Sequence, residues 1–62
     1  MNTEADWLIY AKSNHYRIIC IMKDLEDQEL YPMYFDNETD LQEHLDMIIS
    51  ESKVKVVKII RL

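Results

Sequence analysis

The sequence predicts a single small α+β domain spanning residues 1–62, on three observations. The chain of 62 residues is long enough for one domain, and its composition, 48% apolar and 31% charged, is typical of globular proteins. Several short runs are rich in β-branched and aromatic residues, as strands are. One run instead repeats its apolar residues with helical spacing. We expect a three-stranded antiparallel meander, one amphipathic helix and a final strand (β-β-β-α-β), with the helix packed on one sheet face.

Residues 7–12 (WLIYAK) are interpreted as the first strand, because three of the six are aromatic or β-branched. The alternative is a short helix over residues 4–12, which Thr3 and Asp6 would begin as a capping box and Asn14 would end. We favour the strand because Ser13 and Asn14 suit a two-residue hairpin turn before the next β-like run.

Two further strands follow. Residues 16–23 are apolar on both sides of the strand, which is typical of a central strand covered on both faces, or on one face by a partner. A polar connection, residues 24–29, leads to a third strand at residues 30–35. Pro32 cannot donate a hydrogen bond to a neighbouring strand, so this strand is predicted to lie at a sheet edge.

The clearest element is a helix capped by Asn37 or Thr39 and running to about Ser50. Its apolar residues recur on one face, and these are Leu41, Leu45, Ile48 and Ile49. Residues 53–62 form the final strand, where the alternation slips at residues 56–57, so a bulge or two-sided burial is expected. The final strand is expected beside the first, which leaves the sheet face opposite the helix open to water or to a partner.

The composition excludes several classes of function. The chain has no glycine, which excludes the glycine-rich phosphate loops of nucleotide-binding folds. Turn positions with positive φ are therefore expected at Asn, Asp, Ser or Lys. The single cysteine, Cys20, is expected to be a buried inert thiol, and its lack of a partner fits a reducing compartment, most simply the cytoplasm. No secretory signal or membrane-spanning run is visible.

No group of residues predicts catalysis or metal binding. His15 and His44 lie in different elements, and His44 with Asp40 would supply two ligands where zinc needs three or four. Asp36, Glu38 and Asp40 alternate like the start of a calcium loop, but the glycine and final glutamate of such a loop are missing. We therefore expect no enzyme, no catalytic residue, no cofactor and no metal.

The charges are segregated along the chain. Residues 24–52 contain ten acids and no lysine or arginine, a formal charge of −10, whereas residues 53–62 carry +4 and residues 1–23 carry +1. Like charges spaced three or four residues apart on a helix repel each other. The helix is therefore predicted to present an acidic face, which either attracts a basic surface or is simply a solvated face that favours solubility.

The candidate partner-binding residues lie on and around this helix: Asp36, Glu38, Asp40, Glu43, Asp46, Met47 and Glu51. The basic final strand has three interpretations: a lysine-protected edge, internal neutralisation of the acids, or pairing with another chain. The aromatic side chains either pack in the core and at its rim, or anchor an interface through Trp7, Tyr10 or Tyr34.

These features favour a small acidic protein that regulates or inhibits a basic protein, for example a nucleic-acid-binding one, by imitating nucleic-acid phosphates. Small acidic proteins of phages and mobile elements offer a class analogy. Direct nucleic-acid binding is not expected at a net charge of −5, and no membrane partner is expected. The alternative is an accessory or homo-oligomeric subunit, for example a homodimer, associating through its open sheet face or last strand.

Overall fold

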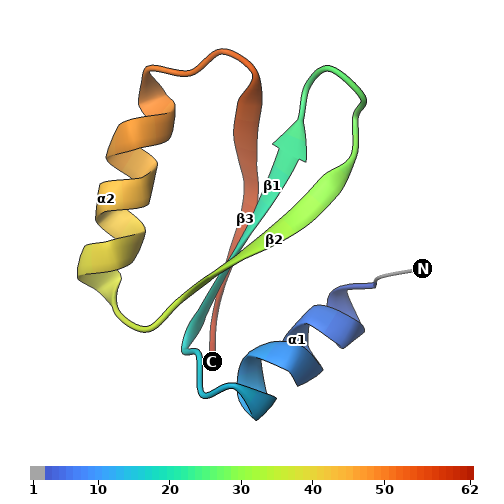
Figure 1. Ribbon diagram of the computed structural model, residues 1–62, viewed down its shortest axis with the longest axis vertical. Helices are drawn as coiled ribbons and strands as arrows, with labels where there is room; N and C mark the ends of the chain where they lie inside the picture. Colours follow the sequence, from blue (N-terminus) through green and yellow to red (C-terminus); the bar gives the residue numbers. More distant parts are fainter. Residues whose placement is uncertain (1–2) are drawn as a thin grey trace.

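The computed structural model describes residues 3–62, apart from the side chain of Ile49. Five elements follow one another along the chain (Figure 1): α1 (Glu4–Ser13), β1 (Ile18–Asp24), β2 (Leu30–Phe35), α2 (Glu38–Ile49) and β3 (Val54–Arg61). The strands form one antiparallel sheet, and the two helices pack on its opposite faces. The α+β class and the three-stranded antiparallel sheet are confirmed, whereas the order of elements is α-β-β-α-β.

The interpretation of residues 7–12 as a strand is wrong, because they lie within α1. Thr3 is the N-cap: the Asp6 amide donates to the Thr3 hydroxyl (3.3 Å), and the Thr3 amide donates to the Asp6 carboxylate (3.1 Å). Trp7 and Ala11, one helical turn apart, are both buried against the sheet. The cap and this packing together outweigh the strand preference of the aromatic residues.

The end of α1 is a Schellman motif rather than a hairpin turn at Ser13–Asn14. The Tyr16 amide donates to the Ala11 carbonyl (2.9 Å), and the His15 amide donates to the Lys12 carbonyl (3.3 Å). Asn14 is the C-cap, and His15 takes the left-handed position that follows it, with φ of 62°. The other positive φ among the described residues, 66°, belongs to Gln28, so the expectation of Asn, Asp, Ser or Lys at such positions is wrong.

The central strand of the sheet is β1, and the strand order is β2-β1-β3. The five residues of β1 from Ile18 to Met22 are all buried, as expected for a strand covered on both faces. On β2, Pro32 lies opposite Ile21 in an edge strand, which confirms the prediction from its missing amide. Because α1 is not a strand, β3 lies beside β1 rather than beside residues 7–12.

The bulge predicted in the final strand is confirmed. The register of β1 with β3 shifts between Ile21, opposite Lys58, and Met22, opposite Val56. Val57 is therefore the extra residue, and both Val57 and Lys58 lie on the α1 side of the sheet, where they line the same groove.

Helix α2 connects the two edge strands and covers the sheet face opposite α1 (Figure 1). Asn37 is its N-cap, accepting from the Asp40 amide (2.8 Å), and Ser50 is its C-cap. The core on this side contains Leu41 and the buried side chains of β1 that face it, Ile18, Cys20 and Met22. The face expected to be open is covered in part by α1, with Trp7, Ala11, Ile19 and Ile21 forming the second core.

Candidate binding surfaces

The outward face of α2 is the surface that the sequence predicted. Leu41 is buried, and Leu45 and Ile48 pack half-buried against the sheet. The helical repeat places Glu43, Asp46 and Met47 on the opposite side of α2. All three are exposed, and Met47 retains 64% of its accessible surface. This face is thus acidic with an apolar centre.

Glu38, by contrast, already has a basic partner. It lies in the first turn of α2 and forms a two-point ion pair with Arg61 at the end of β3, with 3.1 Å between Nη2 and Oε2. The hydrogen bond from Arg61, with its positive charge, lowers the pKa of Glu38. The same contact raises the pKa of Arg61. Glu38 therefore contributes less free negative charge to the surface than its neighbours do.

The other predicted acids are not matched by lysine or arginine within the described residues. Asp46 accepts a hydrogen bond from Gln42 (2.9 Å), and Asp40 accepts one from Asn37 (3.3 Å). Both hydrogen bonds hold the carboxylates in place on the helix surface without neutralising them. The predicted residues do not all share one face, because Asp36 precedes the helix and Glu51 follows it, although both are exposed.

The lysines of β3 do not neutralise this surface. Lys58 faces the α1 side of the sheet and pairs with Glu4 at 3.4 Å, and Lys55, opposite Lys23 in the register, lies on the same side by strand alternation. The sheet therefore separates these lysines from α2. Of the three interpretations of the basic strand, internal neutralisation applies to Arg61 with Glu38 and to Lys58 with Glu4.

The acids in the turn between β1 and β2 have a local structural role. A side-chain oxygen of Asp24 accepts from the Glu26 amide (2.8 Å), and one of Asp27 accepts from the Glu29 amide (2.9 Å). These bonds stabilise the turn in the absence of glycine. Asp24 and Asp27 are thus explained by turn chemistry, whereas Glu26 and Glu29 have exposed carboxylates.

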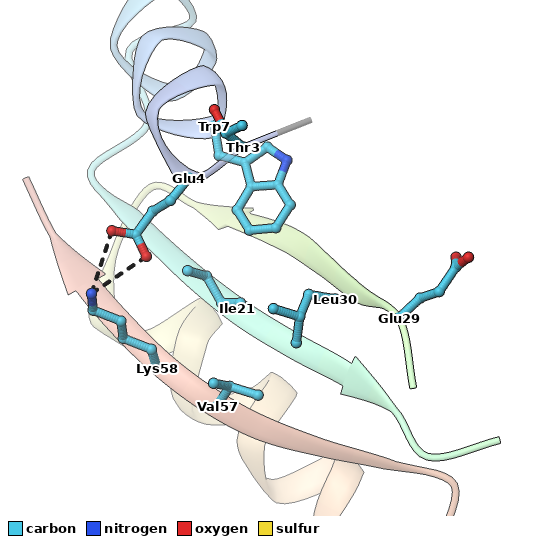
Figure 2. A pocket seen from close by; sticks show the side chains of 8 residues that line it. All are labelled: Thr3, Glu4, Trp7, Ile21, Glu29, Leu30, Val57 and Lys58. Carbon is cyan, nitrogen blue, oxygen red and sulfur yellow. Dashed lines mark hydrogen bonds and ion pairs between the residues drawn. The ribbon is translucent and has the colours of Figure 1, made fainter. Parts of the chain in front are cut away.

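A second surface is an apolar groove on the α1 side of the sheet, on the part of the face expected to be open that α1 does not cover (Figure 2). It has a volume of about 530 Å³. Its floor is Ile21 of β1, between Leu30 of β2 and Val57 of β3, and Trp7 of α1 closes one end. Leu30 and Val57 are each about half exposed, at 50% and 48%. The sequence signals for this groove were the expected open sheet face and the slip in alternation at residues 56–57. Its wall at Trp7 was not predicted, because it depends on α1 being a helix.

The cysteine and the two histidines lie in three different surroundings. Cys20 is buried in the α2-side core, and burial raises the pKa of its thiol. His44 packs its ring against Phe35, with 5.2 Å between centroids, and His15 is exposed at the end of α1. The described residues contain no group of three metal-ligating side chains, and none of their helices is long and apolar enough to cross a membrane.

The aromatic residues proposed as interface anchors divide into two groups. Trp7 is buried in the α1-side core, as the packing interpretation expects, and it also lines the groove. Tyr10 and Tyr16 both pack on Tyr34, with ring centroids 4.8 and 5.3 Å apart, and burial together with its two neighbours raises the pKa of Tyr34. Tyr10 is half exposed and is the anchor candidate that remains most accessible.

Comparison with known proteins gives no family for this chain. No protein-family model matches the sequence, and no curated protein or solved structure shows significant similarity to it. The two surfaces that the fold offers to a partner are the acidic outward face of α2 and the apolar groove on the α1 side.

Proposed function

We propose that this chain binds a basic protein through the outward face of α2 and thereby regulates or inhibits it. The observation that supports the proposal is the set of exposed carboxylates of Asp40, Glu43 and Asp46 around Met47, without an ion pair among the described residues. Asn37 and Ser50 cap the two ends of α2, and Leu41 packs the helix on the sheet, so the carboxylates lie on an ordered element before binding.

The two kinds of side chain on this face have different roles in binding. Carboxylates of one sign attract a positive surface from a distance and raise the rate of association. An exposed apolar side chain such as Met47 adds contact area that is lost from water on binding, and methionine adapts its shape to a partner. An acidic rim around an apolar centre is thus suited to a protein partner whose basic residues surround an apolar site.

Carboxylates on a helix also imitate the phosphates that basic nucleic-acid-binding proteins contact. We infer that the partner belongs to this class of basic proteins and that nucleic acid competes with the chain for it. Direct binding of nucleic acid to the chain itself is disfavoured, because the lysines of β3 lie in a molecule of net charge −5.

The test begins with a tagged chain purified from its own host, with the co-eluting basic protein identified and produced separately. Affinity is then titrated against salt. We expect affinity to fall steeply as salt rises, and Glu43→Lys with Asp46→Lys to abolish binding while the circular dichroism spectrum stays unchanged. Retention of the partner by this double variant would refute the proposal.

A matched control separates this surface from overall charge. Glu43→Lys and Glu26→Lys change the net charge equally, but Glu26 lies in the turn between β1 and β2, away from α2. We expect the first substitution to weaken binding and the second to leave it nearly unchanged. Equal losses would mean that net charge, and not the face of α2, determines the affinity.

A second candidate function, a homo-oligomeric subunit, is favoured by one specific observation. Leu30 and Val57 stand half exposed side by side with Ile21 on the sheet face that α1 leaves uncovered. A chain of 62 residues buries only about 60% of its unfolded surface when folded alone, less than larger domains do, so association adds burial that the monomer lacks.

A further inference from the structure

We draw no further inference here: the strongest candidate, the apolar groove between Trp7 of α1 and the half-exposed Leu30 and Val57 on the α1 side of the sheet, carries nothing because nothing in the structure shows what covers it.

Discussion

Replacing His15 with glycine should stabilise the protein. His15 occupies the left-handed position that ends α1, with φ of 62°, and its side chain is exposed. A residue with a Cβ pays about 1–2 kcal/mol for this conformation. Glycine avoids that cost but loses about 0.5–1 kcal/mol more backbone entropy on folding. The net expected gain from His15→Gly is therefore about 0.5–1 kcal/mol, which corresponds to a rise in Tm of about 2–8 °C for a domain of this size.

Asn14→Gly is the matched control at the preceding position. Asn14 has φ of −105°, so glycine relieves no strain there, and the side-chain hydrogen bond to the Tyr10 carbonyl (2.9 Å) is lost. We expect this variant to be less stable than wild type by about 1 kcal/mol. Both variants are compared with wild type by thermal and urea unfolding at one protein concentration, because association would shift the midpoints.

The pair of variants also discriminates between the two interpretations of residues 7–12. In a hairpin with a turn at Ser13–Asn14, glycine would help at position 14, where a positive φ would be required. A stabilised Asn14→Gly with a destabilised His15→Gly would therefore refute the Schellman motif and the helix that it ends.

Two further substitutions test the pairing of charges and the packing of the core. Because Arg61 lowers the pKa of Glu38 below its usual value of 4.5, the ion pair stabilises the fold above that pH, and this stability is lost as the pH falls through the lowered pKa. In urea unfolding, the midpoint of wild type should therefore be higher than that of Glu38→Gln at pH 7, and the two midpoints should be equal at strongly acidic pH. A difference between the midpoints that does not change with pH would show that the ion pair does not cause it. Met22→Ala should cost about 2–5 kcal/mol, because Met22 is fully buried, and this is a large part of the roughly 3–9 kcal/mol expected for a domain of 62 residues. Met47→Ala, at an exposed site, should change the unfolding free energy by less than about 0.5 kcal/mol, and a comparable loss in both would contradict the assigned packing.

The elements with a strong periodic pattern could be predicted from the sequence. Strand β1, strand β2 with its edge proline and helix α2 between Asn37 and Ser50 all lie where their patterns placed them. Helix α1 was missed because its outward face is also apolar, with Ile9 64% exposed and Tyr10 half exposed, so no helical stripe stands out. The decisive signal was the pairing of Thr3 with Asp6, which is local chemistry rather than periodicity.

The two candidate binding surfaces also differ in how much of each could be predicted from the sequence. Glu43, Asp46 and Met47 could be placed on one face of α2, because helical geometry alone determines their spacing. The pairing of Glu38 with Arg61 could not be predicted, since it depends on the first turn of α2 lying beside the end of β3. The groove depends on where α1 stops covering the sheet, a property of three-dimensional packing that the chain's residue order does not reveal.

The bulge at the single extra residue of β3 decides which way the last part of the chain faces. Val54 and Val56 point toward α2, and unbroken alternation from them would aim Lys58 into the α2-side core and turn Ile59 away from it. Because the bulge lets Val57 and Lys58 both face the α1 side, Ile59 returns to the α2 side and Lys58 stays outside the α2-side core. Arg61 is carried to the same side as Ile59, where it can reach Glu38. Deleting Val57 would therefore remove the bulge and leave the next four side chains on their present faces. A β3 that kept Val57 in unbroken alternation would instead invert all four, bury a lysine and separate an arginine from its carboxylate.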